Sequence, residues 1–317
     1  MRAVTIVDDN RLEVTEHPDP VPGTGEVLVR VRAAGLNGAD LIQVKGLYPA
    51  PPGSPPDIPG LEFAGEVVAL GPSARRFAVG DRVMAVVGGG GQAELAVAHE
   101  RMLMRVPDAV RWVEAGGFPE TFTTAHDALF TQAGLRMGER LLIHGAAGGV
   151  GVAAVQLAVR AGARVTGTVR SERLREKVQA LGAEAIDPAE FTDAGRFDVI
   201  LELVGAPNLA GNLAALATRG RIVVIGHAAG STATVDLLQL MRSRGSIMSS
   251  TLRARPLEEK AVCARRVEAE VLPWLAGGNI HVPVAASFPL VDAERAYQRF
   301  AAGDKFGKVV IEVVPAD

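Results

Sequence analysis

The segment with the clearest chemistry is a glycine-rich turn near the middle of the chain. A short apolar run, LLIHG, leads into the sequence AAGGVG at residues 146–151, and an apolar helical pattern follows. The first backbone amides of such a helix and the positive end of its dipole bind a pyrophosphate, and glycine lets the phosphates approach closely. Ala146 replaces the usual first glycine, which predicts a slightly different turn. We expect a nucleotide cofactor at Ala147, Gly148, Gly149 and Val150, with a structural turn as the alternative.

The segment that directly follows the next predicted strand contains three residues that indicate which cofactor is bound. In NAD-binding proteins an acid about twenty residues beyond the glycines holds the ribose 2′-hydroxyl. Here the strand VTGTV ends in Arg170-Ser171-Glu172-Arg173. The forked donors of arginine beside a serine suit a 2′-phosphate, so Arg170, Ser171 and Arg173 predict NADPH. The alternative is that the arginines only form the solvated start of a helix, a place that also suits Glu172.

Alternating strands and helices must position both segments. From about residue 119 the pattern predicts helices at 124–132, 150–161 and 172–181, and strands at 140–144, 164–169, 185, 198–202, 221–225 and 246–250. This alternation is typical of a doubly wound parallel sheet. The expected fold class is therefore α/β, with a Rossmann domain at residues 120–254.

The first hundred residues have short strands separated by proline and glycine. Strands are expected at 27–33, 62–69, 82–87 and 93–98, and residues 47–60, with six prolines, predict a surface loop. After residue 255 the pattern predicts helices at 257–276 and 291–302 and strands at 285–289 and 308–313. This tail is too short for a third domain, so we expect it to return to the first. The Rossmann domain would then be inserted into a β-rich domain of residues 1–119 and 255–317.

Composition excludes several classes of protein. A chain of 317 residues favours about two domains. Its 33 lysines and arginines against 36 acids give a net charge of -3 and no general attraction to nucleic acid or anionic membrane, so we expect a small-molecule partner. The single cysteine, Cys263, cannot form an intrachain disulfide, which fits a reducing, cytoplasmic setting. No signal peptide is expected in MRAVTIVDDN, and the most apolar stretch, 148–159, is too short to span a membrane.

Along nearly its whole length the sequence resembles the medium-chain dehydrogenase/reductase superfamily and, within it, the zinc-free quinone oxidoreductases. The resemblance rests on AAGLNGADLIQVKGLYPAPPG, PGLEFAGEVVALG, VGDRVMAV, HGAAGGVGVAAVQLA, LGAEAID, GRIVVIG and GKVVIEV. Three further segments, GGGGQAELAV, GFPETFTTAHDALF and SSTLRAR, look closest to the p53-inducible quinone oxidoreductase subgroup. The resemblance implies a GroES-like substrate domain around the Rossmann NADP-binding domain, and a homodimer.

The resemblance also concerns metal binding. Zinc-dependent relatives hold a catalytic zinc with a cysteine after the first long strand and a histidine in a Gly-His-Glu turn. Here these places are Asn37 and Leu61, within Gly60-Leu61-Glu62, and the cysteine-rich structural zinc lobe is missing. We therefore expect no metal. Without a Lewis acid the site suits acceptors that already draw electrons, such as quinones or activated enones.

By the same resemblance, Asn37 and Tyr48 are the candidate catalytic residues. Asn37 is expected near the nicotinamide ribose, where it also contacts the cofactor, and the Tyr48 phenol can donate to a carbonyl oxygen of the substrate. The alternative for Tyr48 is a ring packed on the neighbouring prolines. A second tyrosine of bacterial relatives is Ile42 here, so its donor is lost. Thr124 is expected to approach the nicotinamide amide, unless it is only a polar residue near a helix start. Further cofactor contacts are expected from Gly226, His227, Thr251, Leu252 and Lys308.

These features imply hydride transfer from NADPH to a quinone or an activated enone. An enoyl or alkenal double-bond reductase would use the same hydride, and the sequence leaves both open. The histidines show no spacing with carboxylates typical of a triad, and Asp40 and Glu62 are expected to be structural. A non-enzymatic alternative, an RNA-binding or cofactor-sensing protein, lacks the expected basic cluster interleaved with aromatic residues, which make up 4% of the chain.

Overall fold

The computed structural model describes residues 1–313, and the chain forms two compact units. The β-rich unit holds Met1–Thr123, Leu252–Gly303 and the last strand, which begins at Lys308. The parallel-sheet unit holds Thr124–Thr251 and Asp304–Gly307. The sequence predicts borders at residues 120 and 254, close to these, but it does not predict that residues 304–307 return to the parallel-sheet unit.

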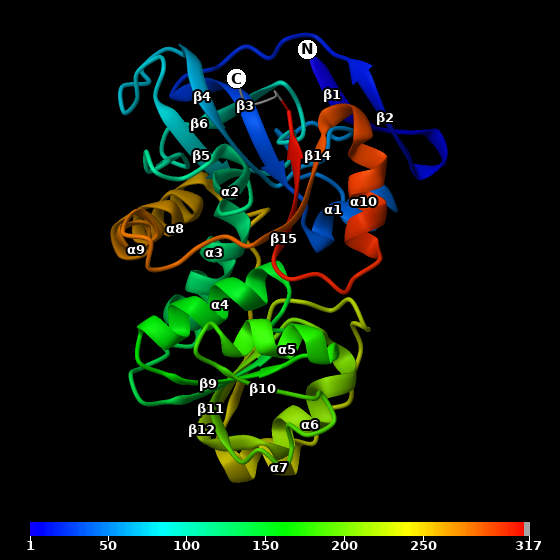
Figure 1. The fold of residues 1–317 in the computed structure, drawn as a ribbon, viewed down its shortest axis with the longest axis vertical. Coiled ribbons are helices and arrows are strands. Elements are labelled where there is room, and N and C mark those ends of the chain that lie inside the picture. The colour runs from blue at the N-terminus through cyan, green and yellow to red at the C-terminus, as the bar shows by residue number, and fades with distance from the viewer. Residues whose placement is uncertain (314–317) are drawn as a thin grey trace. The chain divides into compact units, whose positions relative to one another are not determined.

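The β-rich unit is built on a seven-stranded sheet in the order β14-β15-β3-β4-β5-β7, with β6 also pairing with β3. β3 pairs antiparallel with β4, β6 and β15. Its alternate residues Val27, Val29 and Val31 are fully buried in one apolar core. The tail therefore returns to the first domain as predicted, and Figure 1 shows the red β15 beside the blue β3. The strands are β3 (Glu26–Gly35), β4 (Glu62–Leu70), β5 (Arg82–Val86), β6 (Leu95–His99), β7 (Met104–Arg105), β14 (Val284–Pro289) and β15 (Lys308–Glu312).

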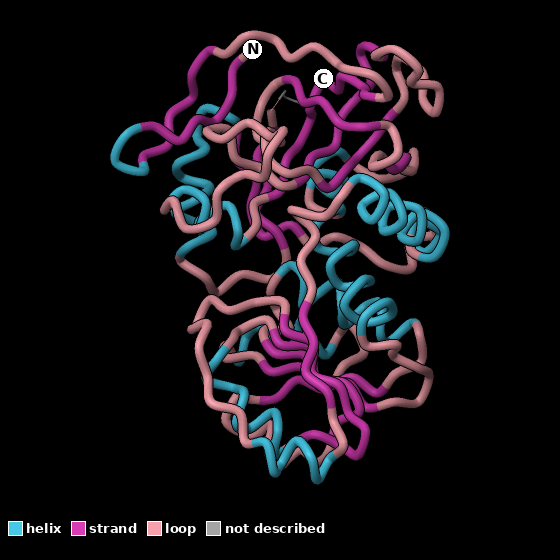
Figure 2. The backbone as a smooth tube through the Cα atoms, turned by 180° about the vertical axis from the view of Figure 1, so that it is seen from behind, coloured by secondary structure: helices cyan, strands magenta, loops and turns pink. Residues whose placement is uncertain are grey.

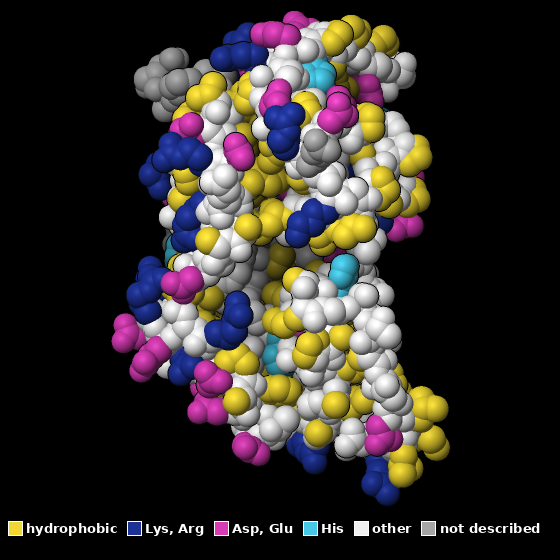
Figure 3. Space-filling view, turned by 90° about the vertical axis from the view of Figure 1, so that its right-hand side faces the viewer, with side chains coloured by type: hydrophobic (Ala, Val, Ile, Leu, Met, Phe, Trp, Pro, Cys, Tyr) yellow, Lys and Arg dark blue, Asp and Glu magenta, His cyan; other side chains and the backbone are white. Residues whose placement is uncertain are grey.

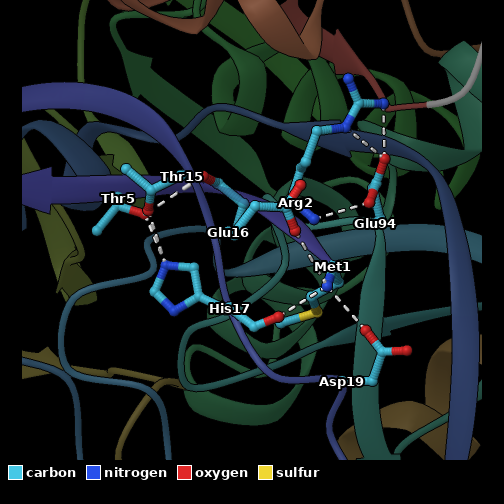
Figure 4. A network of polar contacts seen from close by, with 9 residues as sticks. Met1, Arg2, Thr5, Thr15, Glu16, His17, Asp19 and Glu94 are labelled. Carbon is cyan, nitrogen blue, oxygen red and sulfur yellow. Dashed lines mark hydrogen bonds and ion pairs between the residues drawn. The ribbon is translucent and has the colours of Figure 1, made fainter.

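An N-terminal hairpin, β1 (Arg2–Val7) and β2 (Arg11–Glu16), was not predicted from the sequence. Figure 4 shows its polar contacts: the hydroxyls of Thr5 and Thr15 lie 2.6 Å apart, and Nε2 of His17 lies 2.8 and 3.1 Å from them. The N-terminal ammonium donates to the carbonyl of His17 at 2.7 Å and to the carboxylate of Asp19 at 2.8 Å. These contacts give His17 a structural role in the hairpin.

Short helices complete the β-rich unit. They are α1 (Gly38–Val44), α2 (Trp112–Gly116), α8 (Leu257–Glu270), α9 (Leu272–Ala276) and α10 (Ala293–Ala301). The single helix predicted for 257–276 is wrong, because the helix is interrupted at Val271. Pro273 has no N–H to donate, and its ring crowds the carbonyl four residues earlier. Residues 47–60 contain neither helix nor strand, as the six prolines predict.

The parallel-sheet unit has six parallel strands in the order β10-β9-β8-β11-β12-β13, the Rossmann order expected from the sequence. Figure 2 shows these strands side by side in a twisted sheet. Helices α4 and α5 pack on strands at one end of the order, and α6 and α7 pack on β12. The elements are β8 (Arg140–His144), β9 (Arg164–Thr168), β10 (Glu184–Ile186), β11 (Phe197–Glu202), β12 (Leu216–Val224), β13 (Ser246–Ser249), α4 (Gly149–Arg160), α5 (Glu172–Gln179), α6 (Leu209–Ala214) and α7 (Leu237–Ser243).

Two predictions for the parallel-sheet unit need correction. The helix expected at 124–132 is the continuation of α3 (Pro119–His126), and Asp127–Gln132 has π-helical hydrogen bonding. The strand expected at 221–225 is longer, because β12 begins at Leu216 and bends at Arg219, whose φ is 62°. No helix in the described part of the chain is long and apolar enough to cross a membrane.

Candidate functional site

The glycine-rich turn joins β8 to α4 in the parallel-sheet unit. Gly145 makes the sharp bend with φ 71°, one position before the alanine that replaces the usual first glycine. Gly148 is the extended N-cap of α4, and the first helical hydrogen bond runs from the amide of Val152 to its carbonyl at 2.8 Å. The amides of the first helical turn have no partner within the helix. The turn therefore presents N–H donors at the positive end of a helix, as the sequence predicts for a pyrophosphate.

Two glycines of this turn have different reasons to lack a side chain. A Cβ on Gly151 would lie 2.4 Å from the carbonyl oxygen of Gly145, so the close packing of α4 against the turn requires glycine. A Cβ on Gly148 meets only the same oxygen, at 3.4 Å, and would project into the open side of the turn. Glycine at this position therefore keeps a side chain away from the side of the turn where a phosphate is predicted.

Residues 304–307 also meet the turn. The amide of Gly307 donates to the carbonyl of Ala147 at 3.0 Å, and Gly148 and Gly307 form an isolated parallel β-bridge. The sequence gives no sign of this contact, because more than a hundred residues separate the two segments. The turn is thus supported by a segment from the C-terminal part of the chain.

A buried polar cluster supports the loops at the carboxyl ends of β8, β9 and β11. Nε2 of His144 lies 2.7 Å from Oδ1 of Asn212, and Nδ1 lies 3.1 Å from the hydroxyl of Thr168. The Glu202 carboxylate accepts from Nδ2 of Asn212 and from the amides of Val204 and Gly205. Burial lowers the pKa of His144, although the nearby Glu202 acts in the opposite direction. His144 is therefore a buried neutral support for these loops.

Gly226 and His227 follow β12 at the same edge of the sheet. The amide of Gly226 donates to the carbonyl of Glu202 at 3.1 Å, and a Cβ on Gly226 would lie 2.3 Å from the carbonyl oxygen of Leu203. The loops after β11 and β12 therefore pack tightly against each other. Cofactor contacts of Gly226 and His227 stay a prediction.

The arginines predicted to select the cofactor follow β9. The amide of Ala146 donates to the carbonyl of Thr168 at 3.2 Å, so this turn adjoins the glycine-rich one. Arg170 is exposed, Ser171 is the N-cap of α5, and Glu172 begins that helix. Arg173 pairs with Asp304 at 2.8 Å, with both side chains more than half exposed. Two cationic side chains and a hydroxyl thus stand beside the predicted pyrophosphate site.

Arg175 has a different role from its neighbours. Its guanidinium donates to the carbonyl of Val169 at 2.9 Å and to the carboxylate of Asp187 at 2.5 Å. These contacts hold the turn after β9 against the end of β10. Arg175 is therefore committed to the framework, whereas Arg170 is exposed at the same turn.

Asn37 lies in a buried polar cluster of the β-rich unit. Nζ of Lys308 lies 2.6 Å from the carbonyl of Leu36, 2.8 Å from Oδ1 of Asn37 and 2.7 Å from Oε1 of Glu62. Nδ2 of Asn37 donates to the same Glu62 oxygen at 2.9 Å. The three N–H donors of Lys308 are thus used within the β-rich unit, and so are the polar atoms of the Asn37 amide. Their predicted cofactor contacts stay untested.

Asp40 extends this cluster. It is fully buried and accepts from the amides of Asn37 at 2.7 Å and Gly60 at 3.2 Å, so it joins the start of α1 to the Gly60-Leu61-Glu62 turn. Burial raises the pKa of Asp40 to about 7, while these amides and Lys308 oppose the shift. Asp40 and Glu62 have the structural contacts expected from the sequence. Within residues 1–313 no three His, Cys, Asp or Glu side chains gather as metal ligands.

Tyr48 begins the proline-rich loop and is half-buried. Within the described residues its hydroxyl has no hydrogen-bond partner, so the phenol is free to donate to a ligand. Burial raises the pKa of Tyr48, opposed by Arg253 and assisted by the Glu120 carboxylate. The phenol therefore stays protonated at neutral pH.

Arg253 holds the Tyr48 loop and is not among the site residues predicted from the sequence. Its guanidinium lies 4.9 Å from the centre of the Tyr48 ring and donates to the Tyr48 carbonyl at 2.8 Å. It also donates to the carbonyl of Gly88 at 2.7 Å and to Oε1 of Gln43 at 2.5 Å. Arg253 is 2% exposed. The segment SSTLRAR contains it, but its partners lie about two hundred residues earlier, and a single sequence does not reveal such a contact.

The remaining predicted cofactor residues divide between the two units. Thr124, which is buried in α3, and Thr251 belong to the parallel-sheet unit. Leu252 belongs to the β-rich unit and is buried there. The borders at 123/124 and 251/252 therefore fall next to predicted cofactor residues. Their contacts with a cofactor stay predictions.

Two family models match parts of the predicted domains. Residues 23–108 match the alcohol dehydrogenase GroES-like domain, and residues 149–268 match the zinc-binding dehydrogenase model. A quinone oxidoreductase of Pseudomonas aeruginosa is 33% identical over 311 residues, covering 95% of each chain. The polyketide synthase GfsB of Streptomyces halstedii is 32% identical over 92% of this chain, which spans 5% of that much longer protein.

Solved structures agree with these matches. A quinone oxidoreductase of Pseudomonas syringae has a TM-score of 0.83 and 31% identity, covering 98% of this chain and 99% of that one. A mycobacterial protein complexed with NADPH has a TM-score of 0.86 and 29% identity, covering 99% and 100%. An NAD-dependent alcohol dehydrogenase has a TM-score of 0.86 and 30% identity, also covering 99% and 100%.

Proposed function

Because this chain belongs to the medium-chain dehydrogenase/reductase superfamily and is a homologue of quinone oxidoreductases, we propose that it transfers hydride from NADPH to a quinone or an activated enone without zinc. The observation that carries the proposal is the glycine-rich turn with its free helical amides beside Arg170, Ser171 and Arg173. NADPH, when bound, supplies the hydride. Reduction of a quinone consumes one hydride and one proton and gives a hydroquinone.

The residues of this chain have separate roles in the proposal. The first amides of α4 hold the pyrophosphate, and Arg170, Ser171 and Arg173 hold the 2′-phosphate. The Tyr48 phenol donates a hydrogen bond to the acceptor oxygen, where negative charge grows as hydride arrives, and the proton comes from solvent. Arg253 fixes the backbone of Tyr48 and faces its ring. Catalysis then depends mainly on positioning.

The choice of NADPH is supported by the turn after β9, which carries two arginines and a serine and ends without a ribose-binding acid. Among similar structures one holds NADPH and another is named for NAD. The preference of this chain for NADPH is therefore inferred from the residues of this turn. We expect NADPH to bind at least tenfold more tightly than NADH, about 1.4 kcal/mol. Fluorescence titration of the two cofactors measures this difference, and equal affinities would contradict it.

The arginine variants provide the matched test. Arg170→Ala with Arg173→Ala should remove most of the preference for NADPH while NADH affinity changes little. Arg175→Ala is not a suitable control, because Arg175 holds the framework. Arg164→Ala is a suitable control, because within the described residues its exposed guanidinium donates only to the carbonyl of Gly138, at the opposite end of β9. A loss of NADPH affinity in the Arg164 variant equal to that of the double variant would reject the assignment.

Zinc does not fit the residues of the β-rich unit. Asn37 and Leu61 stand at the places where zinc-dependent relatives have a cysteine and a histidine, and Leu61 is a buried apolar side chain. The Glu62 carboxylate next to them already faces a cation, the Lys308 ammonium at 2.7 Å. A divalent cation there would meet this ammonium and an amide nitrogen in place of anionic ligands.

Reduction of an activated carbon-carbon double bond is the second candidate function. It is favoured by the 32% identity with polyketide synthase GfsB across 92% of this chain. The same hydride and the same phenol serve an enone, whose carbonyl oxygen also gains charge during the reaction. Comparison of kcat/KM for quinones and for 2-alkenals with NADPH separates the two candidates.

A small-molecule substrate, a cytoplasmic setting and a homodimer complete the proposal. Figure 3 shows basic and acidic side chains interspersed on one face, in keeping with the net charge of -3, and Cys263 is a buried thiol that forms no disulfide within the described residues. β13 is one of the two edge strands of the parallel sheet. Leu237, Leu238 and Met241 of the neighbouring α7 are each more than half exposed. An outer strand beside exposed apolar side chains favours pairing with a second copy.

A further inference from the structure

The β-rich unit contains a cavity of about 370 Å³ next to the Tyr48 loop. One wall is formed by Pro51–Pro55, which follow Tyr48, and by Gly88 and Gly89. A second wall carries Arg253, Arg255 and Lys260. We name this space the basic cavity. Its volume lies in the range of small-molecule sites.

The basic cavity is lined by more cationic than anionic side chains. Among the described residues that line it, Glu26 contributes the one carboxylate, and this already accepts from the amide of Gly23 at 2.7 Å. Arg253 is buried, and within the described residues its hydrogen bonds run to neutral acceptors, two carbonyls and an amide oxygen. The cavity wall therefore carries a guanidinium charge that these neutral acceptors do not cancel.

In the described part of the chain the Asp40 and Glu120 carboxylates attract Arg253 without a hydrogen bond to it, and two acidic residues of α8 are directed elsewhere. Glu258, in the first turn of α8, pairs with Arg101, and its side chain is 71% exposed. Glu259 reaches Arg255 only at 3.9 Å and is 61% exposed. Arg255 also donates to Sγ of Cys263 at 3.0 Å. An exposed pair of this length contributes little energy.

Lys260 differs from Arg253 and Arg255 in its polar contacts. Within the described residues its ammonium makes no hydrogen bond or ion pair, although the side chain is half-buried. Burial lowers the pKa of Lys260, Arg253 lowers it further, and the Glu120 carboxylate opposes both. A half-buried ammonium without an acceptor loses hydration and gains no bond, so an anionic partner would stabilise it.

We propose that the basic cavity binds an oxyanionic group, a carboxylate, sulfonate or phosphate, carried by the electron acceptor, with Lys260 as its ion-pair partner. This rests on the proposed function, because Arg253 both lines the cavity and faces the ring of Tyr48. The acceptor's reacting carbonyl lies at Tyr48 and its acidic group lies in the cavity. The enzyme thereby prefers acidic quinones or enones to neutral ones.

The test compares 1,4-naphthoquinone-2-sulfonate with 1,4-naphthoquinone as acceptors. Lys260→Met should lower kcat/KM for the sulfonated quinone at least tenfold and change that for the neutral quinone no more than twofold. Lys260→Arg, which keeps the charge, should restore most of the loss. Arg101→Gln is the matched control, because it removes a neighbouring cation that does not line the cavity. An equal loss on both quinones, or on neither, would overturn the proposal.

Two further measurements separate the alternatives. Calorimetric titration with 1-naphthalenesulfonate, which accepts no hydride, should show binding to the wild type and a tenfold weaker affinity in Lys260→Met. This reports on the cavity even if NADPH reduces neither quinone, a result that would reject the proposed function alone. Inorganic phosphate should compete with the sulfonated quinone. If phosphate binds through Lys260 without competing, the cavity holds a separate anion, and its assignment to the acceptor is wrong.

Discussion

Arg253 contacts both the backbone and the ring of Tyr48. The phenol of Tyr48 is free to donate, while the backbone of the same residue is held by Arg253 at 2.8 Å. Substitution at Tyr48 therefore separates the hydroxyl from the packing of the ring. Asp40 offers a test through the pH dependence of folding stability, because its buried carboxyl has an unusually high pKa of about 7.

Tyr48→Phe should lower kcat by roughly ten- to a hundredfold, because it removes a hydrogen bond to a developing oxyanion worth about 1.5 to 3 kcal/mol. The ring and its contact with Arg253 are retained, so NADPH affinity should not change. Steady-state kinetics and cofactor titration measure both quantities. If Tyr48→Phe is silent while Tyr48→Ala impairs quinone binding, the residue is a packing surface and the donor role is wrong.

Asp40 should make folding stability depend on pH. Its pKa is about 7 in the folded state against 3.8 in the ordinary case, so between these values the folded state holds a proton that the unfolded state has lost. Stability therefore falls as pH rises from about 4 to about 7, by up to roughly 4 kcal/mol, and is constant above that range.

Asp40→Asn should remove this contribution, because the amide does not titrate. Urea denaturation at pH 5 and pH 7.5 gives the change in unfolding free energy for each protein. His144, whose pKa is lowered by burial, acts with the opposite sign but is present in both proteins, so it cancels in the difference. Identical pH dependence in the wild type and the variant would show that Asp40 is not the group responsible.

The glycines of the turn between β8 and α4 serve two purposes. Gly151 allows the helix to pack against the turn, whereas Gly148 leaves room on the open side. Both glycines belong to one sequence motif, and their individual roles follow from what surrounds each Cα. Substitution of each by alanine distinguishes packing from binding.

Gly148→Ala should weaken NADPH and NADH binding alike, by at least tenfold, with little change in Tm, because its Cβ meets the protein only at 3.4 Å. Gly151→Ala should instead lower stability by about 1 to 3 kcal/mol through overpacking. Thermal denaturation and cofactor titration of both variants provide the comparison. If Gly148→Ala binds both cofactors normally, the phosphates do not lie on that side of the turn.

The edge strand β13 and the exposed apolar residues of α7 favour a homodimer. Light scattering after size-exclusion chromatography should give about twice the chain mass of 33.1 kDa. Met241→Asp combined with Ile247→Asp should give a monomer, since both residues are exposed on α7 and β13. Val79→Asp, at an equally exposed apolar residue of the β-rich unit, should remain dimeric. A monomeric wild type would reject the proposal.

The amino-acid sequence alone predicted the alternation of strands and helices in the Rossmann domain, the turn at residues 146–151 and the arginines that follow β9. These features are local: a strand, a glycine turn and a helix follow one another within about twenty residues, and their periodicity indicates each element. The proline-rich loop was predictable for the same reason, because proline restricts the backbone wherever it stands. The hairpin of β1 and β2 and the short helices α1, α6 and α7 gave weaker patterns and were not predicted.

The packing of the chain in three dimensions determines which distant side chains come into contact. It brings Lys308 to Asn37 and Glu62, Arg253 to Tyr48 and Gly88, and Gly307 to Ala147. Each contact joins segments separated by more than a hundred residues, and no periodicity within one segment specifies its partner. Burial also changes the chemistry of these groups, raising the pKa of Asp40 and leaving the ammonium of Lys260 without an acceptor in the described chain. Their residue types were visible in the sequence, but their environments arise only when the chain packs.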